Sequence, residues 1–182
     1  MSAEPVDAAV IVAARVEHLP ALEALIFDHG ANSWNYLPED GIRAHLADIA
    51  CGRDHGLVAL FEGDILGAVT FGLRTDFDRY VPAPLRGTPQ GYVSEAVVRR
   101  DRVGQGLGTR LLREALAVLS TMGVQRVFID RHEENQASAG MMRRAGFVEI
   151  DTYSDPRRRP HGSGRTTVCC FSYPAESGLP GR

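Results

Sequence analysis

Three alternating glycines stand between two apolar segments in the second half of the chain. The first segment is 92–98, the glycines are Gly104, Gly106 and Gly108, and a leucine-rich segment runs from 107 to 122. This order predicts a strand, a tight turn and a helix. A glycine-rich turn at a helix N-terminus leaves backbone N–H groups unpaired, and the helix dipole adds positive character there. Such turns bind phosphate groups, so we expect a phosphorylated cofactor.

Two common phosphate-binding motifs fit this turn poorly. The nucleotide P-loop requires a lysine after its last glycine, and all 20 residues counted as Lys+Arg in this chain are arginine. The dinucleotide fingerprint belongs to the first strand-to-helix turn and has an acid about 20 residues further on. Asp130 follows Gly108 at about that distance, but the turn lies past the middle of the chain, after strands that look antiparallel.

A third motif fits better. The segment 98–109, Val-Arg-Arg-Asp-Arg-Val-Gly-Gln-Gly-Leu-Gly-Thr, closely resembles the V-x-P-x-x-R-G-x-G-x-G signature of the GNAT superfamily of N-acetyltransferases. Residues 135–147 begin Asn-Gln-Ala-Ser and end in Gly-Phe, which is similar to the second signature of that family. The resemblance covers about residues 8 to 173. It implies the α/β (α+β) GNAT fold: a mixed, largely antiparallel sheet of about seven strands, splayed between its two central strands and flanked by about four helices.

The apolar periodicity and the turn residues give the same order of elements. We expect a single domain over residues 1–173 and a flexible tail over 174–182. The predicted strands are 9–14, 56–61, 65–73, 91–98, 124–130, 147–153 and 166–173, and the predicted helices are 18–29, one that begins at Pro38, 107–122 and 136–145.

Composition excludes several classes of protein. No apolar run approaches the ~20 residues of a membrane span, no signal peptide is recognisable at the start, and a net charge of −3 argues against bulk nucleic-acid binding. The three cysteines, Cys51, Cys169 and Cys170, lack metal-ligand spacing, and neighbours on a strand point to opposite faces. We therefore expect a reduced, cytoplasmic protein without a metal.

The resemblance implies acetyl-CoA as the co-substrate and assigns its site. Backbone amides of the glycine turn should hold the pyrophosphate, and the end of the preceding strand should bind the pantetheine arm and polarise the thioester. Asn135 should contact the pantetheine or cap the following helix, and Ser138 assists there or is an ordinary helix residue. The predicted cofactor residues are Val97, Val98, Arg99, Val103, Gly104, Gln105, Gly106, Leu107, Gly108, Thr109, Asn135 and Ser138.

The resemblance also implies the chemistry. An alkyl ammonium must lose a proton before it attacks, which requires a base, and Glu95 lies on the strand before the turn, among apolar neighbours that would raise its pKa. The alternatives are a solvent-facing glutamate and a base that acts through water. Met142 stands where the family often has a tyrosine that protonates the departing thiolate. We assign that role to Tyr153, with Tyr92, Ser138 or water as alternatives.

The acceptor is less well determined. By resemblance it should meet the predicted substrate-binding residues Trp34, Tyr36, Asp76, Asp78 and Tyr80. Acids beside aromatic rings suit a cationic amine. The arginine-rich segment 155–165 is expected to be a solvated loop, with an acidic acceptor, the 3′-phosphate of the coenzyme or RNA as alternative partners.

These observations predict an enzyme that transfers an acetyl group to the primary amine of a small molecule, such as an antibiotic, a polyamine or an amino-acid-like metabolite. Transfer would be direct, in a ternary complex. The alternatives are acetylation of a protein N-terminus or an aminoacyl-tRNA and, in a different class, a non-catalytic acyl-CoA-binding module. A homodimer is an open alternative for the assembly, and no membrane partner is expected.

Overall fold

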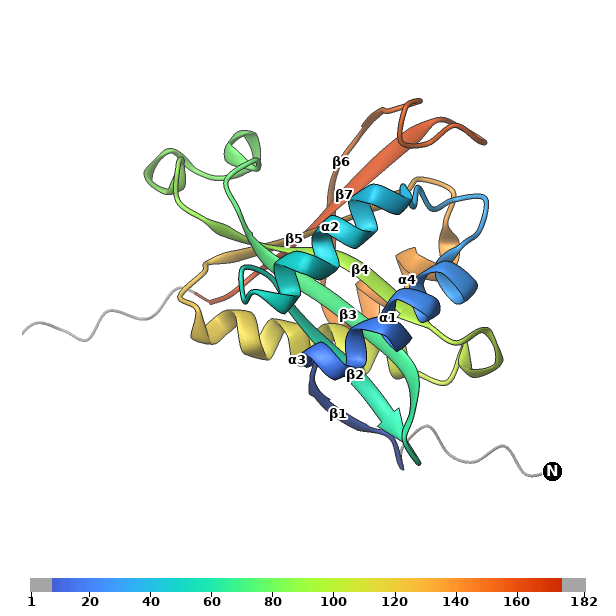
Figure 1. Ribbon diagram of the computed structural model, residues 1–182. Helices are drawn as coiled ribbons and strands as arrows, with labels where there is room; N and C mark the ends of the chain where they lie inside the picture. Colours follow the sequence, from blue (N-terminus) through green and yellow to red (C-terminus); the bar gives the residue numbers. More distant parts are fainter. Residues whose placement is uncertain (1–7, 175–182) are drawn as a thin grey trace, which may run out of the picture.

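Seven strands form one mixed sheet in the order β1-β2-β3-β4-β5-β7-β6 (Figure 1). The computed structural model describes residues 8–174. Every neighbouring pair is antiparallel except β4 and β5. The strands are β1 (Val10–Ala13), β2 (His55–Phe61), β3 (Asp64–Arg74), β4 (Gln90–Val98), β5 (Arg126–His132), β6 (Val148–Ser154) and β7 (Arg165–Ser172).

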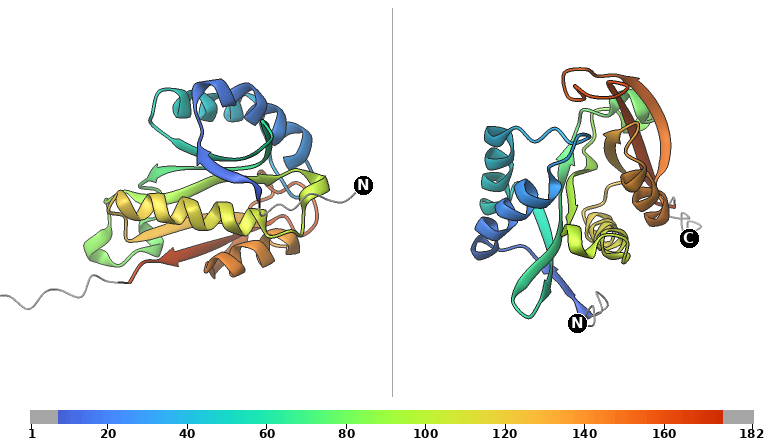
Figure 2. Two further views of the ribbon diagram at one scale, coloured as in Figure 1. Left: turned by 90° about the horizontal axis from the view of Figure 1, so that it is seen from below. Right: turned by 90° about the vertical axis from the view of Figure 1, so that its right-hand side faces the viewer.

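Helices cover both faces of the sheet (Figure 2). The pair α1 (Leu19–Leu25) and α2 (Glu39–Ala50) lies on one face, and α3 (Leu107–Thr121) and α4 (Gln136–Ala145) lie on the other. A π-helical turn, Ile26–Gly30, continues α1. This sheet with its four α-helices confirms the predicted fold class.

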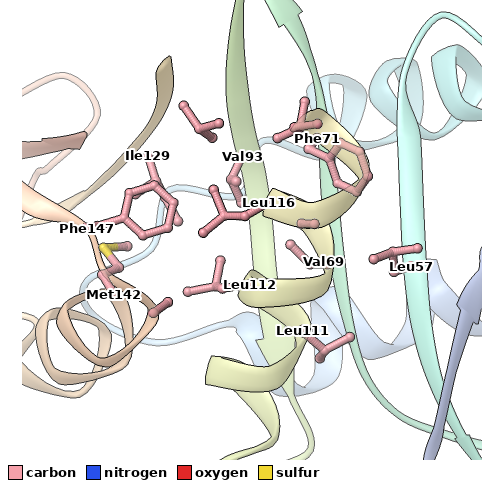
Figure 3. Close-up of a cluster of buried hydrophobic side chains, with 14 of the residues drawn as sticks. Leu57, Val69, Phe71, Val93, Leu111, Leu112, Leu116, Ile129, Met142 and Phe147 are labelled. Carbon is pink, nitrogen blue, oxygen red and sulfur yellow. The ribbon is translucent and has the colours of Figure 1, made fainter. Parts of the chain in front are cut away.

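Two apolar cores follow from the alternation of side chains along the strands. On β3, Ala68 packs with Leu22 and Leu46 under α1 and α2, whereas its neighbour Val69 packs on the α3 side. The α3 helix buries Leu107, Leu111, Leu112, Leu116 and Leu119 at helical spacing, which is the stripe read from the sequence. Figure 3 shows this core, with Met142 and Phe147 closing it from the α4 side.

The sheet is open at its centre. Strands β4 and β5 pair only over Gly91–Val93 and Val127–Ile129. Among the described residues, the rest of β4 has no partner on β5, so the edge of Ser94–Val98 faces a gap. This is the predicted splay, and it exposes backbone polar groups to whatever enters the gap.

Other expectations compare with the structure as follows. Cys169 and Cys170 are free and pack in different apolar clusters, as their adjacent positions on β7 predicted. No helix in residues 8–174 is long and apolar enough to cross a membrane. The predicted tail 174–182 lies, apart from Pro174, outside the described residues.

Candidate functional site

The glycine turn forms one wall of a cavity of about 160 Å³ between β4, α3 and α4. Gly104 and Gly106 adopt left-handed φ angles of 83° and 84°, which only glycine reaches without strain. Among the described residues, the backbone N–H groups of 103–109 meet no backbone carbonyl. The turn therefore presents unpaired donors at a helix N-terminus, as the sequence predicted.

A buried hydroxyl supports the assignment of a phosphate ligand to this cavity. Thr109 lines the cavity, and within the described residues its Oγ1 is buried without a hydrogen-bond partner. An orphaned buried donor usually has an absent ligand or water as its partner. The residues present therefore fit the pyrophosphate of an acyl coenzyme A.

Gly108 serves a different purpose from the other two glycines. A Cβ at this position would lie 2.5 Å from Met141 Sδ. Glycine thus allows the first turn of α3 to pack against α4, and this packing sets the width of the cavity.

Most of the predicted cofactor residues lie in this cavity, and four lie outside its wall. The side chain of Val97 is buried in the core under α1 and α2. Arg99 pairs with Asp101, and Gln105 Nε2 reaches the Asp101 carbonyl at 3.4 Å. The Asn135 side chain accepts a hydrogen bond from the Ser138 N–H at 3.1 Å, which confirms the helix-cap interpretation. The predicted residues that line the cavity are Val98, Val103, Gly104, Gly106, Leu107, Gly108, Thr109 and Ser138.

Glu95 lies in a second, small cavity in the gap between β4 and β5. Ser138 lines both cavities, so the glutamate adjoins the cofactor side. Within residues 8–174, its carboxyl group makes no hydrogen bond or ion pair. Burial, together with the charge of Asp130, raises the pKa of Glu95 to about 8, while Arg158 and Arg159 oppose the rise. A carboxyl group with this pKa can take a proton from an amine near neutral pH.

A third cavity, of about 310 Å³, continues from the Glu95 cavity and has aromatic walls. Asp130 and Arg158 line both. Tyr80, Tyr92 and Tyr153 form part of its wall. Polar edges and aromatic faces suit an organic amine.

The predicted acceptor residues divide between the cavities and the surrounding scaffold. Asp76 and Tyr80 line the aromatic cavity, and Tyr36 lines the Glu95 cavity. Trp34 instead packs on His132, with 4.7 Å between the ring centroids. The Asp78 carboxylate accepts a hydrogen bond from the Gly87 N–H at 2.8 Å and closes a turn.

The arginine-rich segment gives the main correction to the sequence analysis. Arg159 is only 5% exposed, so the expectation of a solvated loop is wrong for this residue. Its guanidinium contacts Asp130 at 2.6 Å, Thr166 Oγ1 at 3.0 Å and the Trp34 carbonyl at 3.2 Å. Arg158 also binds Asp130. The segment therefore forms a wall of the acceptor side.

Asp130 connects the elements of this wall. Besides the two arginines, the Tyr92 hydroxyl donates to it at 2.9 Å. From the sequence, Asp130 had no predicted role at this site, and Arg158 and Arg159 were expected in a solvated loop, with contacts to an acidic acceptor, the 3′-phosphate of the coenzyme or RNA as alternatives. Arg158 and Asp130 are 28 residues apart in the sequence, so no local pattern linked them.

The residues considered as proton donors to the departing thiolate line different cavities. Tyr153 lines the aromatic cavity, away from the glycine turn, and burial raises its pKa. Met142 is buried in the core and borders the Glu95 cavity, so the usual position of the tyrosine carries no proton donor. Ser138 is the hydroxyl placed between the cofactor and Glu95 cavities. The assignment of Tyr153 stays a prediction.

His132 joins two segments through its ring nitrogens. Its Nδ1 accepts from the Glu134 N–H at 3.0 Å, and its Nε2 donates to the His161 carbonyl at 2.8 Å. The ring of His132 therefore connects the turn before α4 with the arginine-rich segment. No cluster of potential metal ligands occurs in residues 8–174.

Comparison with known proteins agrees with the geometry. The model of the acetyltransferase (GNAT) family matches residues 22–147. N-alpha-acetyltransferase 30 of Schizosaccharomyces pombe is 29% identical over 79 residues, which are 40% of this chain and 53% of that protein, so the match spans about half the length of this curated relative.

Solved structures share the fold at low sequence identity. A ribosomal-protein-alanine N-acetyltransferase from Brucella melitensis has a TM-score of 0.71 at 20% identity, covering 90% of this chain and 99% of that one. AAC(6')-Iy, solved with the bisubstrate analogue CoA-S-monomethyl-acetylneamine, has a TM-score of 0.65 at 17% identity, covering 79% and 92%. Acceptors named for such structures thus include both proteins and small molecules.

Proposed function

The chain belongs to the acetyltransferase (GNAT) family, and we propose that it is an N-acetyltransferase that uses acetyl-CoA to acetylate the primary amine of a small molecule. The observation that carries the proposal is the position of Glu95. This carboxyl group lies between the cofactor cavity and an aromatic cavity large enough for an organic amine. Its pKa of about 8 suits proton removal from an ammonium group.

The proposed reaction uses few groups of the chain. Glu95 accepts a proton from the ammonium, and the freed amine attacks the thioester carbonyl. A backbone N–H on the open edge of β4 stabilises the negative oxygen of the tetrahedral intermediate. Collapse of this intermediate breaks the C–S bond, and the nitrogen gives its second proton to water, which leaves the neutral amide. The thiolate leaves and takes a proton from water or from a hydroxyl such as Tyr153, because a thiol pKa near 8.5 makes strong acid assistance unnecessary.

The shape of the acceptor side supports a small molecule. The aromatic cavity is walled by side chains from residues 74–80, from strands β4, β5, β6 and β7, and from the arginine-rich segment. Arg158, held by Asp130, lies between this cavity and Glu95. A compact amine can pass its reactive end beyond Arg158, with its remaining part against Tyr80 and Tyr153.

A protein N-terminus is the second candidate acceptor. The similarity to N-alpha-acetyltransferase 30 and the fold shared with a ribosomal-protein-alanine enzyme favour it. An N-terminal peptide would extend from Glu95 along Tyr36, which is 45% exposed at the mouth of the gap.

One experiment tests both the reaction and the acceptor. The chain is supplied with acetyl-CoA and either a panel of small amines (spermidine, an aminoglycoside and free amino acids) or short peptides that begin with Ala or Met, and thiol release is followed. We expect turnover with a small amine and a loss of about 10²–10⁴-fold in Glu95→Gln. Peptides as the better acceptors would replace the first candidate by the second, and turnover insensitive to Glu95→Gln would refute the assigned base.

A further inference from the structure

Strand β4, which carries the proposed base Glu95, has an irregularity in its pairing with β3 directly beside that residue. Val93 pairs with Phe71, and Glu95 pairs with the preceding residue, Thr70, so Ser94 has no partner on β3. A bulge of this kind bends a strand and re-aims the next side chain. The direction of the Glu95 carboxyl therefore depends on how firmly this bulge is held.

A buried chain of hydrogen bonds ends on the backbone at this point. The Glu95 N–H donates to Thr70 Oγ1 at 3.2 Å. Thr70 Oγ1 lies 2.8 Å from His45 Nε2, and His45 Nδ1 lies 2.8 Å from Asp54 Oδ2. Thr70 is fully buried, and Asp54 is 3% exposed.

The charges determine the direction of each hydrogen bond. Burial acts to raise the pKa of Asp54, but hydrogen bonds and charge from Arg74 and His45 lower it overall, so Asp54 is ionised and accepts. Burial lowers the pKa of His45, which is therefore neutral near pH 7. With its proton on Nδ1, facing Asp54, the ring accepts through Nε2 from the Thr70 hydroxyl. Thr70 Oγ1 is then left with lone pairs for the Glu95 N–H.

The other end of this series of hydrogen bonds, at Arg74, reaches the acceptor side. Arg74 donates to both carboxylate oxygens of Asp54, at 2.8 and 2.6 Å, and it also lines the aromatic cavity. Buried polar groups are costly unless each is satisfied. Here the side chains of Arg74, Asp54, His45 and Thr70 satisfy one another's hydrogen-bonding groups. Thr70 in turn contacts the bulge, because its Oγ1 accepts from the Glu95 N–H.

We propose that Thr70, oriented by His45 and Asp54, is a positioning residue that fixes the β4 bulge and holds the Glu95 carboxyl between the cofactor and acceptor cavities. This inference rests on the proposed role of Glu95 as the base. It does not depend on which amine is the acceptor.

Two substitutions of Thr70 separate positioning from packing. Thr70→Val keeps the shape and removes the hydroxyl, whereas Thr70→Ser keeps the hydroxyl and removes a methyl group. The full chain is labelled with ¹³C at the glutamate side chains and with ¹⁵N, and Glu95→Gln assigns the Glu95 signal. The carboxyl signal is titrated between about pH 3.5 and 10 without any acceptor, and the exchange of the Glu95 amide hydrogen is followed. Acetyl-CoA binding confirms that each variant is folded.

The expected result is a contrast between the two variants. Wild type and Thr70→Ser should titrate with a midpoint near 8, the value that burial and Asp130 give Glu95 against Arg158 and Arg159. In Thr70→Val the midpoint should fall by roughly one pH unit or more as water reaches the carboxyl. The Glu95 amide should exchange roughly tenfold faster once its acceptor is gone.

Other outcomes are equally decisive. If Thr70→Val and Thr70→Ser behave alike in both measurements, the positioning role is wrong even though Glu95 remains the base. If wild-type Glu95 titrates near 4.5, the environment assigned to the base in the proposed function is itself wrong. Should Thr70→Val not fold, His45→Leu removes the acceptor of the Thr70 hydroxyl instead, and an unchanged Glu95 amide and midpoint in that variant would overturn the inference.

Discussion

The two halves of the site are built from different parts of the chain. The cofactor half is largely backbone, with left-handed glycines and unpaired N–H groups over the contiguous residues 103–109. The acceptor half is made of side chains, and its central contact joins Asp130 to Arg158 and Arg159. One short segment of the sequence is enough to recognise a phosphate through its backbone. The acceptor wall, in contrast, forms only when segments that are distant in the sequence pack together.

This difference predicts where each half is vulnerable. A wall made of side chains should lose stability when one charge is removed, because the remaining charges are left buried without compensation. A backbone cradle should fail only when its φ angles change. The expected effects below decrease in size from the acceptor half to the cofactor half.

The largest effect should come from Asp130→Asn. The variant leaves Arg158 and the buried Arg159 facing a neutral amide, and removal of one partner of a buried ion pair costs about 3 kcal/mol or more of unfolding free energy. Urea unfolding measures this loss. Asp78→Asn is the control, since Asp78 is exposed and accepts only from the Gly87 N–H. Equal losses in the two variants would mean that the arginine wall is not held by Asp130.

The second effect concerns the pH dependence of stability. The folded-state pKa of Glu95, about 8, is raised above its ordinary value of 4.5. The folded chain therefore binds more protons than the unfolded chain between these values, and its stability should decrease as pH rises from about 4.5 to about 8. Glu95→Gln should remove this decrease. Parallel curves of unfolding free energy against pH for the two proteins would contradict the burial of a neutral carboxyl group.

A third prediction tests the backbone half through Gly106→Ala. At a φ of 84°, alanine costs about 1–2 kcal/mol, although nothing lies within 4 Å of the new Cβ. Strain here should re-aim the N–H groups, and we expect the Kd for acetyl-CoA to rise roughly tenfold. Gly52→Ala is matched in strain, with a φ of 78° and open space around it, but Gly52 lies in the turn after α2. Calorimetry should find weaker binding only for Gly106→Ala.

The contrast between the halves also explains what the sequence could predict. The strand, the glycine turn and the leucine stripe of α3 are local signals within residues 92–119, so the phosphate-binding turn was predictable from that segment, whereas Ser138 and Met141 of α4 complete the cavity wall. The Asp130–Arg158 contact spans 28 residues and depends on the pairing of β5 with β7. No local pattern encodes such a pairing, and a run of arginines is ordinarily solvated.

The bulge on β4 was unpredictable for a related reason. Ser94 is unpaired only because of the register between β3 and β4. His45 contacts Thr70 of β3 from helix α2, which is distant in the sequence. Trp34 was likewise predicted, from the family resemblance, to contact the acceptor. Its ring packs on His132 instead, and its carbonyl accepts from Arg159.

The smallest effect should come from Val103→Arg, which adds a positive charge at the glycine turn. Val103 is 61% exposed and lines the cofactor cavity, so the change should alter stability by no more than about 0.5 kcal/mol. An added guanidinium can pair with the pyrophosphate, but in water such a pair contributes only about 0.2–1 kcal/mol. We expect a roughly two- to fivefold tighter Kd for acetyl-CoA, and salt should reduce the gain. Val148→Arg, at a similarly exposed valine on β6, should leave binding unchanged. A gain much larger than this would mean that charge, rather than the backbone cradle, limits cofactor binding in this chain.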